Sequence, residues 1–352
     1  MRDALDDAAG LSSAATPVAV LTAIDDDDAR ALCEAFGLPA PQGIEGIAGG
    51  SVNSNFALRT PSGRVFCRLY EERDLPGAQR EAAMLGRLAQ AGVPTPAPLT
   101  RVAAWGGGCV LVVRGKPAAL FPWRDGHIRC QASVTPEDAS CVGEALARVH
   151  EAGRLEAAEA SRFGLADLLG RLARIEGSGD ARFAPLAPRL RTLLQDCQTR
   201  RDPVLPSGLI HGDLFRDNVL WDGPRLSALL DFESACLSTY AYDLMVTVLS
   251  WCFGDDLDPG LASAMVAGYE RVRTLTPAER RGMHAEASFA ALRFTVTRIT
   301  DYAMRSGAAG PRVIKDWGRF MKRFEKLEAL GSDGFQAVLL DGAAGPAGGP
   351  AG

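Results

Sequence analysis

Residues 211–220 read HGDLFRDNVL and follow directly on an apolar run at residues 208–210. Within eight positions the stretch holds a histidine, two aspartates, an arginine and an asparagine. A short apolar run is typical of a buried strand, and polar groups beside a core need hydrogen-bond partners or a ligand. The pattern therefore predicts a strand that ends in a functional loop.

A second apolar run, residues 226–230, follows a turn composition and ends at Asp231, which Phe232 follows. A hairpin-like return of this kind would gather Asp213, Asn218 and Asp231 at one strand-end corner. Phosphoryl transfer needs such a corner. One carboxylate accepts the proton of the attacking hydroxyl, while an amide and a second carboxylate hold Mg²⁺ against nucleotide phosphates. The spacing from Asp213 to Asn218 equals that of a kinase catalytic loop, and the Asp-Phe pair stands where kinases have Asp-Phe-Gly.

Each of these residues also has an ordinary structural interpretation. A lone aspartate in a loop usually stabilises a turn, and a lone histidine is usually a hydrogen-bonded core residue. The agreement of several spacings favours the catalytic interpretation, in which His211 and Arg216 accompany Asp213. We expect His211 to hold the loop by hydrogen bonds, whereas Arg216 either reaches a phosphate or pairs with Asp217 or Asp243.

The composition is that of an ordinary globular protein. The chain has 352 residues, of which 47% are hydrophobic and 23% charged, and its formal net charge is −5. This length is sufficient for two lobes. The mild acidity argues against a general nucleic-acid-binding protein, which needs a basic surface, but it is compatible with an anionic small substrate held by a few arginines.

Cysteine spacing and the N-terminus indicate the compartment. The eight cysteines include no Cys-x-x-Cys pair and no Cys/His cluster, so free thiols in a reducing cytoplasm are favoured over a zinc site. The first ten residues, MRDALDDAAG, are acidic, and no run approaches the roughly 20 apolar residues that span a bilayer. We expect a cytoplasmic protein without a membrane segment.

Periodicity, caps and turn residues predict the elements. In the first half we expect helices at residues 25–36 and 78–91, a hairpin at 56–70 and a strand at 109–113. In the second half we expect helices at residues 136–151, 165–175, 186–199, 241–253, 259–274, 277–305 and 313–330.

The domain boundaries follow from these patterns. Residues 1–15 are small or polar and predict a mobile N-terminus, and the Gly/Ala/Pro run at 342–352 predicts a disordered tail. Between them we expect a sheet-rich N-lobe at residues 16–120 and a helical C-lobe at residues 121–341. A ligand is expected in the cleft between the lobes.

Three stretches around the predicted corner resemble the aminoglycoside phosphotransferase and choline kinase superfamily, whose fold is similar to that of protein kinases. They are HGDLFRDNVLWD (211–222), LLDFESAC (229–236) and YAYDL (240–244). Three further stretches are similar to the bacterial homoserine kinases of that fold: GIAGGSVNSNFAL (46–58), GKPAALFPWRDG (115–126) and ALRFTVTRITDY (291–302). The resemblance covers residues 15–330. It implies an α+β, bilobal protein-kinase-like fold with a small antiparallel-sheet N-lobe and a larger, mainly helical C-lobe.

The resemblance also implies roles for residues at matching positions. Asp213 matches the catalytic base, Asn218 and Asp231 match the Mg²⁺ ligands, and Asp243 matches a buried carboxylate that supports the catalytic loop. Taken alone, the segment that matches the loop over the ATP phosphates would more often be a hairpin turn. Its matching residues are Gly49, Gly50, Ser51, Asn53 and Ser54.

In the kinase pattern a lysine on the third strand pairs with a glutamate on the next helix, and here the matching residues are Arg68 and Glu81. Arginine also binds phosphate, but its planar fork requires a different geometry. The alternative for Arg68 is a surface arginine on an edge strand. The adenine is expected near Phe121 and Trp123, although Trp123 is equally compatible with the core.

Three residues are candidates for binding the acceptor. Arg293 and Arg298 lie five residues apart on a predicted helix and so do not share a face cleanly. One of them would bind a substrate carboxylate, while the other forms a structural pair. Glu233 stands where homoserine kinases tend to carry an aromatic residue, and it would attract a substrate ammonium group or cap a helix.

The sequence thus predicts an ATP- and Mg²⁺-dependent kinase of a small-molecule hydroxyl, with L-homoserine converted to O-phospho-L-homoserine as the first expectation. Glu233 leaves open an aminoglycoside or amino-alcohol (choline-like) kinase. Arg68 leaves open a catalytically inactive, nucleotide-binding module. We expect neither a nucleic-acid nor a membrane partner, and the sequence does not predict the oligomeric state.

Overall fold

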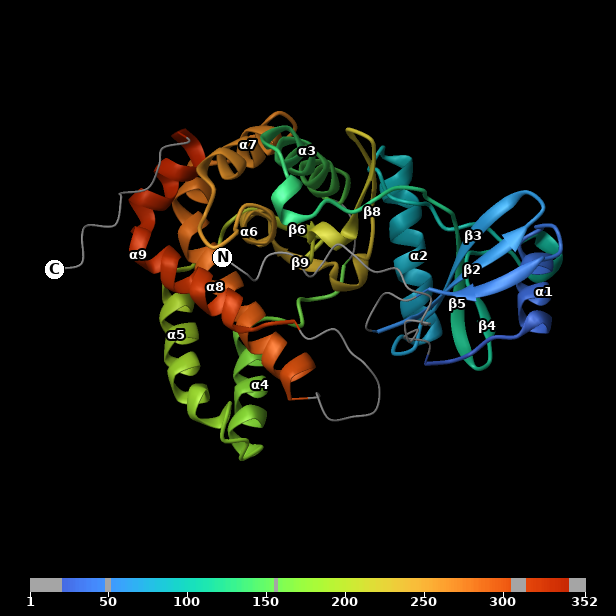
Figure 1. Ribbon diagram of the computed structural model, residues 1–352, viewed down its shortest axis with the longest axis horizontal. Coiled ribbons are helices and arrows are strands. Elements are labelled where there is room, and N and C mark those ends of the chain that lie inside the picture. Colours follow the sequence, from blue (N-terminus) through green and yellow to red (C-terminus); the bar gives the residue numbers. More distant parts are fainter. Residues whose placement is uncertain (1–20, 48–51, 155–157, 305–314, 342–352) are drawn as a thin grey trace, which may run out of the picture. The chain divides into compact units, whose positions relative to one another are not determined.

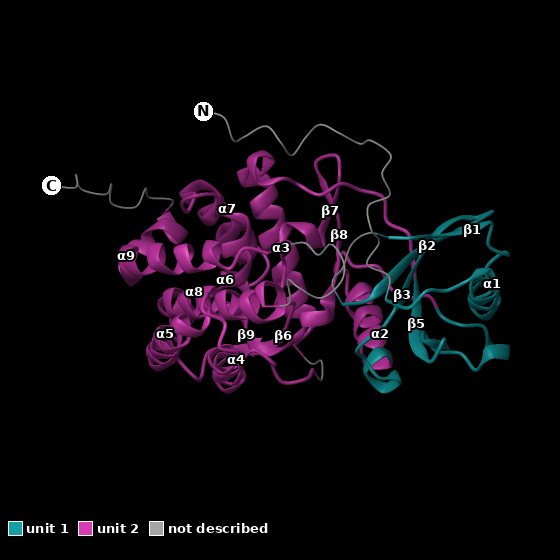
Figure 2. Ribbon diagram, turned by 60° about the horizontal axis from the view of Figure 1, so that its bottom comes forward, with its two compact units in different colours: residues 1–78, 100–120, 309–311 teal, residues 79–99, 121–308, 312–352 magenta. Residues whose placement is uncertain are grey.

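The computed structural model (Figure 1) describes residues 21–47, 52–154, 158–304 and 315–341. The N-terminus and the tail that the sequence predicts to be mobile or disordered, residues 1–15 and 342–352, lie outside this part of the chain. The chain divides into two compact units, which Figure 2 distinguishes by colour. Unit 1 comprises residues 1–78, 100–120 and 309–311, and unit 2 comprises residues 79–99, 121–308 and 312–352.

Unit 1 is built on a five-stranded sheet in the order β1-β2-β3-β5-β4. The strands are β1 (Gly43–Gly46), β2 (Ser54–Thr60), β3 (Gly63–Leu69), β4 (Leu111–Val113) and β5 (Lys116–Pro122). The pairs β1–β2, β2–β3 and β4–β5 are antiparallel. The predicted hairpin is confirmed, because β2 and β3 are joined by a tight turn in which the Thr60 hydroxyl donates to Gly63 O at 2.9 Å.

Helix α1 (Asp26–Ala35) in unit 1 confirms the capped helix expected at this position. The Asp25 carboxylate accepts a hydrogen bond of 3.0 Å from Asp28 N, and the Asp28 carboxylate accepts one from Asp25 N. Arg114 donates to Asp28 at 2.7 Å and also binds Asp25, which ties the helix start to the turn between β4 and β5. Carboxylates at this end also interact favourably with the helix dipole.

Unit 2 is mainly helical, and each helical stretch predicted in the second half of the sequence contains a helix. The helices that contribute to it are α2 (Leu75–Gln90), α3 (Pro136–Ala152), α4 (Leu165–Gly177), α5 (Ala187–Arg200), α6 (Tyr240–Trp251), α7 (Pro259–Glu270), α8 (Pro277–Arg298) and α9 (Gly318–Asp341). Three predicted ends are wrong. Helix α7 ends at Glu270 rather than at residue 274, a π-helical turn, Ile299–Ala303, follows α8 at Arg298, and α9 continues past a kink at Gly331.

Two short antiparallel pairs interrupt the helices of unit 2. Strand β6 (Ser207–Ile210) pairs with β9 (Cys236–Thr239), and β7 (Val219–Asp222) pairs with β8 (Arg225–Leu229). The sequence predicts β6 and β8 because they are apolar, but it does not predict β7 or β9. Four residues are too few to show a strand period. The fold class expected from the sequence, a small antiparallel sheet with a larger helical part, is confirmed.

Helix α6 forms the core of unit 2 and is buried along its whole length. Figure 1 shows it among α3, α7 and α8, with which it is in contact. A helix that is apolar on all sides has no face for solvent. Its one charged residue, Asp243, is fully buried, so neighbouring groups must compensate the charge.

All eight cysteines are free thiols, and five of them are buried. Within the described ranges, no helix combines the length and apolar character needed to cross a bilayer.

Helices α3 and α7 cross at two glycines. A Cβ atom at Gly268 would lie 2.1 Å from Ser140 O, and one at Gly143 would lie 2.1 Å from Met265 O. Because both obstacles are backbone oxygens, a side chain at either position would force the helices apart. Gly170 in α4 offers a contrast, since a Cβ there meets nothing within 4 Å.

We predict that Gly268→Ala lowers the free energy of unfolding by about 1–3 kcal/mol or more, because overpacked helices must separate. Gly170→Ala is the matched control and should raise stability by roughly 0.5–1 kcal/mol, since alanine is the better helix former. Urea unfolding of both variants measures the difference. Equal effects would show that the crossing tolerates a methyl group.

Candidate active site

Residues 211–218 form a loop between strands β6 and β7. Two short-range backbone hydrogen bonds fold the loop: Phe215 N donates to Asp213 O at 2.7 Å, and Asn218 N donates to Phe215 O at 3.0 Å. Leu230 N then donates to Asn218 O at 2.8 Å, which brings the end of β8 against this loop. The structure thus brings Asp213, Asn218 and Asp231 together at one corner of unit 2.

The Asp213 carboxylate is 28% exposed and faces a buried arginine, since Arg293 Nη1 lies 3.8 Å from Asp213 Oδ1. Burial raises the pKa of Asp213, and the negative charge of Asp231 raises it further. The cations of Arg293 and Lys315 oppose this shift but do not cancel it. A carboxylate with a raised pKa is a stronger proton acceptor than an exposed aspartate.

Asn218 and Asp231 present oxygen donors beside Asp213. The Asn218 side chain donates through Nδ2 to Asp213 O at 2.8 Å, so its Oδ1 is left as an acceptor. Asp231 adopts the left-handed conformation, with φ 62° and ψ 62°, which aspartate tolerates better than most residues. Such hard oxygen donors fit a magnesium ion that binds to a nucleotide.

The donor set is too small to hold a metal by protein groups alone. Within the part of the chain that the structure describes, no group of three or more His, Cys, Asp or Glu residues is placed to bind an ion. Mg²⁺ at a nucleotide site takes one or two carboxylate or amide oxygens and completes its shell with phosphates and water. The residues at this corner therefore fit an ion that arrives with a nucleotide rather than a permanent structural metal.

Asp243 holds the start of the loop from the first turn of α6. Its Oδ2 accepts from His211 N at 2.7 Å, and its Oδ1 accepts from Gly212 N at 2.8 Å. Gly212 has φ 75°, and a Cβ there would lie 2.7 Å from Ser234 O, so the position requires glycine. Burial acts to raise the pKa of Asp243, but the hydrogen bonds that it accepts, first among them the one from His150, outweigh burial and leave the pKa below its usual value.

His211 lies inside the corner in the scaffold position expected from the sequence. Its Nε2 is 3.0 Å from Leu230 O, and its Nδ1 accepts from Asp213 N at 3.3 Å. Its ring packs against Phe232, with the centroids 4.4 Å apart. One imidazole thus connects the backbone on both sides of the corner, at Asp213 and beside Asp231.

Arg216 binds the opposite end of α6. Its Nη1 donates to Ser250 O at 2.7 Å and also binds Gln131 Oε1. Among the described residues it forms no ion pair with Asp217 or Asp243, the partners that the sequence left open. A cation at the carbonyl end of a helix is favourable for the helix dipole. The contact makes Arg216 an anchor of the loop.

Two further residues of α6 bind the middle of the loop. Leu214 O accepts from Ser250 Oγ at 3.2 Å and from Trp251 Nε1 at 3.0 Å. Together with Asp243 and the Arg216 contact, these bonds attach the catalytic loop to both ends of one buried helix.

The candidate acceptor residues lie on α8 beside aromatic rings. The Arg293 guanidinium is 3.8 Å from the Phe163 ring centroid and 3.7 Å from that of Phe294. The Arg298 guanidinium is 4.4 Å from the Phe320 ring centroid and donates to Asp316 O at 2.8 Å.

Charge links Arg298 to the corner. Burial lowers the pKa of Arg298 to about 10, and the negative charge of Asp213 opposes that shift. Sequence reasoning missed Lys315, whose Nζ is 4.0 Å from Asp217 Oδ2. Its positive charge opposes the rise in the pKa of Asp213. Asp213 therefore has three cations in its surroundings. Glu233 is half-buried in the 3₁₀ turn directly after Asp231.

The candidate nucleotide residues fall in different parts of the chain. Gly49, Gly50 and Ser51 lie outside the described residues. Asn53 and Ser54 are buried at the start of β2 and both bind Glu71, with Asn53 Oδ1 accepting from Glu71 N at 3.1 Å and Ser54 Oγ donating to Glu71 Oε1 at 2.5 Å.

Arg68 is half-buried on β3, which lies between β2 and β5, so the alternative of a surface arginine on an edge strand is wrong. Glu81 is buried on α2 and belongs to the other unit. Phe121 is buried at the end of β5, and Trp123 Nε1 donates to Asp125 Oδ1 at 3.0 Å.

Comparison with known proteins identifies the relatives of this chain. Residues 43–284 match the model of a phosphotransferase enzyme family. A homoserine kinase of Methylorubrum populi is 35% identical over 292 residues, which cover 81% of this chain and 88% of that protein. A homoserine kinase of Gluconacetobacter diazotrophicus is 36% identical over 320 residues, 87% of this chain and 95% of that protein.

Solved structures show the same fold. A microcompartment-associated aminopropanol kinase superposes with a TM-score of 0.62 at 19% identity, covering 91% of this chain and 100% of that one. A spectinomycin phosphotransferase in complex with ADP and spectinomycin gives a TM-score of 0.62 at 13% identity, covering 92% of this chain and 100% of that one. These similarities confirm the kinase-like fold that the sequence predicts.

Two buried tryptophans offer a test of how α6 holds the loop. Trp251 Nε1 binds Leu214 O, whereas Trp221 Nε1 has no hydrogen-bond partner among the described residues, and both side chains are fully buried. We predict that Trp251→Phe lowers the free energy of unfolding by at least about 1 kcal/mol more than Trp221→Phe, because only the first change removes a hydrogen bond. Chemical unfolding measures both. A larger loss in the Trp221 variant would mean that packing, not this bond, dominates.

Proposed function

The chain belongs to the phosphotransferase enzyme family, and we propose that it transfers the γ-phosphoryl group of ATP to the hydroxyl of L-homoserine. The observation that carries the proposal is the corner of unit 2, where Asp213 stands beside Asn218 and Asp231 and faces the cations of Arg293 and Lys315. The homoserine kinases that resemble the chain over most of their length support the same substrate.

In this proposal Asp213 accepts the proton of the attacking hydroxyl and orients its oxygen. Its raised pKa suits it to take up a proton as the new bond to phosphorus forms. Asn218 Oδ1 and the Asp231 carboxylate would hold Mg²⁺, which supplies charge neutralisation for the phosphoryl oxygens when it is bound. No covalent enzyme intermediate is required, since positioning and electrostatics provide the acceleration.

We assign the nucleotide to the residues that match the nucleotide site of the kinases that the sequence resembles. Gly49, Gly50, Ser51, Asn53 and Ser54 would cover the phosphates, because the resemblance to kinases extends over this segment. Arg68 would act at the phosphates in place of a lysine. Its half-buried position on an inner strand supports this role. The adenine would lie near Phe121 and Trp123.

The charge around Asp213 supports an acceptor that carries a carboxylate. Arg293, Arg298 and Lys315 all interact electrostatically with Asp213. A polycationic aminoglycoside or a choline-like alcohol would be repelled by such a group of cations, whereas an amino acid would bring a compensating negative charge. Glu233 beside Asp231 is suited to the ammonium group of the same molecule.

An amino-alcohol kinase is the second candidate. Glu233 alone favours it, because a carboxylate next to the metal corner attracts any substrate ammonium group. The two candidates differ in one chemical group, since 3-aminopropan-1-ol is homoserine without its carboxylate. The proposal further places the protein in the cytoplasm, which the eight free thiols support.

We predict that Asp213→Asn lowers kcat with ATP and L-homoserine by at least about 100-fold, because the amide cannot accept the hydroxyl proton. The matched control is Asp217→Asn in the same loop, where the side chain is 58% exposed. It should retain activity close to that of the unaltered protein. A coupled ADP-release assay measures both. Full activity of the Asp213 variant would remove it as the base.

We predict that Arg298→Met lowers kcat/KM for L-homoserine by about tenfold or more, as expected for a lost charge-assisted contact, and leaves that for 3-aminopropan-1-ol unchanged. Arg323→Met is the control, because Arg323 lies over the same Phe320 ring at 4.6 Å but donates to Phe253 O. Its effect on the two alcohols should be equal. A parallel loss for both alcohols in the Arg298 variant would argue against a carboxylate contact.

A further inference from the structure

The anchor of the catalytic loop depends on one buried carboxylate with three donors. The Asp243 carboxylate accepts from His211 N and Gly212 N, and its Oδ2 also lies 3.0 Å from His150 Nε2. The side chains of Asp243 and His150 are both fully buried. His150 belongs to α3, so the loop is tied through α6 to a third part of unit 2. Any shift of the Asp243 carboxylate would move both loop amides with it.

The donors and acceptors available at His150, Tyr269 and Arg273 determine the direction of the hydrogen bonds that lead to Asp243. Burial lowers the pKa of His150, which favours the neutral ring with one N–H. His150 Nδ1 lies 2.7 Å from the Tyr269 hydroxyl, which accepts a hydrogen bond of 3.2 Å from Arg273 Nη1. Because the ionised Asp243 carboxylate can only accept, the ring proton is on Nε2, where it is donated to Asp243. With one N–H on the ring, Nδ1 is then the acceptor of the Tyr269 hydroxyl proton.

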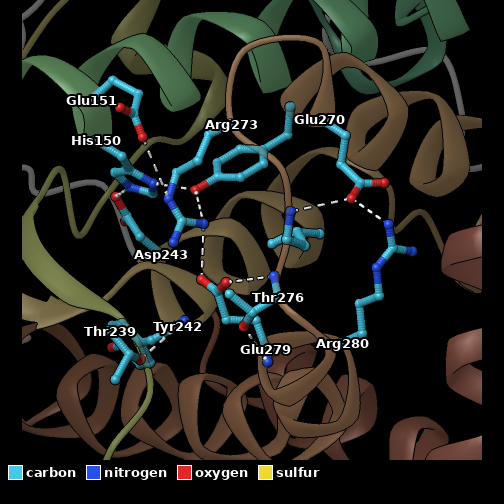
Figure 3. Close-up of polar contacts among 12 residues, drawn as sticks. His150, Glu151, Thr239, Tyr242, Asp243, Glu270, Arg273, Thr276, Glu279 and Arg280 are labelled. Carbon is cyan, nitrogen blue, oxygen red and sulfur yellow. Dashed lines mark hydrogen bonds and ion pairs between the residues drawn. The ribbon is translucent and has the colours of Figure 1, made fainter.

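The chain of contacts continues to the start of α8 (Figure 3). Arg273 Nη1 forms an ion pair of 2.8 Å with Glu279 Oε1, and the Arg273 guanidinium lies 4.5 Å from the Tyr240 ring centroid. Glu279 also closes the helix cap with Thr276, accepting from its backbone N at 2.9 Å. The donors thus point in one direction, from Arg273 through Tyr269 and His150 to Asp243.

We propose that His150 and Tyr269 are positioning residues for phosphoryl transfer, which hold the Asp243 carboxylate where it fixes the catalytic loop. The inference rests on the proposed function for its kinetic part only. Neither residue touches the corner formed by Asp213, Asn218 and Asp231, and both act through Asp243. The placement of the base therefore depends on a tyrosine hydroxyl on α7, two hydrogen bonds away from Asp243.

A residue of the same type nearby allows the hydroxyl to be tested apart from the ring. Tyr242 is buried on α6, next to Asp243, and its hydroxyl has no hydrogen-bond partner among the described residues. Replacing either tyrosine by phenylalanine removes one oxygen atom from the core. Only at Tyr269 does that oxygen take part in the chain of donors.

The first experiment compares Tyr269→Phe with Tyr242→Phe in the full-length protein. We expect Tyr269→Phe to lower kcat by about fivefold, the effect of one net hydrogen bond, with KM for ATP and L-homoserine unchanged. Hydrogen–deuterium exchange of the peptide covering residues 208–215 should accelerate in this variant. Tyr242→Phe should keep the kcat and the exchange rate of the unaltered protein.

The second experiment tests the donor to Asp243 directly. His150→Phe keeps a flat ring but removes the Nε2 donor, and we expect kcat to fall further than in Tyr269→Phe, with faster exchange in the same peptide. His150→Gln keeps an N–H group at a similar reach and should recover part of the loss. This recovery separates positioning from the filling of space, which phenylalanine does at least as well as glutamine.

The outcomes separate the two proposals. If the unaltered protein does not phosphorylate L-homoserine, the proposed function fails, while the exchange rates still test the positioning role. Equal exchange and equal kcat in Tyr269→Phe and Tyr242→Phe would overturn the inference, and so would a His150→Gln variant no better than His150→Phe.

Discussion

The site depends on the two hydrogen bonds that the Asp243 carboxylate accepts from the backbone amides of His211 and Gly212, at the start of the catalytic loop. A fully buried carboxylate without partners would cost several kcal/mol, so the charge is tolerable only where donors surround it. The reverse also holds. The loop brings its two amides to that carboxylate with Gly212 at φ 75°, a conformation in which a Cβ would lie 2.7 Å from Ser234 O. Charge burial and backbone shape therefore require each other.

Helix α6 turns this single contact into a rigid support. Its first turn supplies the acceptor Asp243, and its last turn supplies the Ser250 carbonyl that binds Arg216 and the donors that bind Leu214. A cation at the carbonyl end is favourable for the helix dipole. Because α6 is buried along its whole length, it has little freedom to move. The loop is therefore attached to both ends of one rigid helix.

The elements that depend on local chemistry could be predicted from the sequence. The acidic start of α1, the turn between β2 and β3 and the spacing from Asp213 to Asn218 each lie within a few residues of one another, where caps, turns and periodicity are informative. Arg216 shows the limit of such reasoning. The sequence offered nearby carboxylates as partners, whereas the structure gives it a carbonyl at the far end of α6.

The contacts behind the site could not have been found in this way. His150, Tyr269 and Glu279 lie on three helices and meet only because α3, α7 and α8 pack around Asp243. A lone histidine near the end of an amphipathic helix carries no signal of its partner in the sequence. Helical periodicity predicts which face of a helix is buried, but it does not identify the side chain that the face will meet.

The arginines near the corner differ in what binds them, and this difference distinguishes structural from functional roles. Arg216 and Arg323 donate to carbonyls at the end of α6 and the turn after it, where the helix dipole offsets part of their charge. Arg293 and Arg298 lie over the rings of Phe294 and Phe320, and Arg298 donates to Asp316 O, which is not at the carbonyl end of a helix. An aromatic face orients a guanidinium without supplying a negative charge. These two arginines, of which Arg293 lies 3.8 Å from Asp213, are therefore oriented without the compensation that a helix end gives Arg216, and an anionic acceptor requires such positive charge.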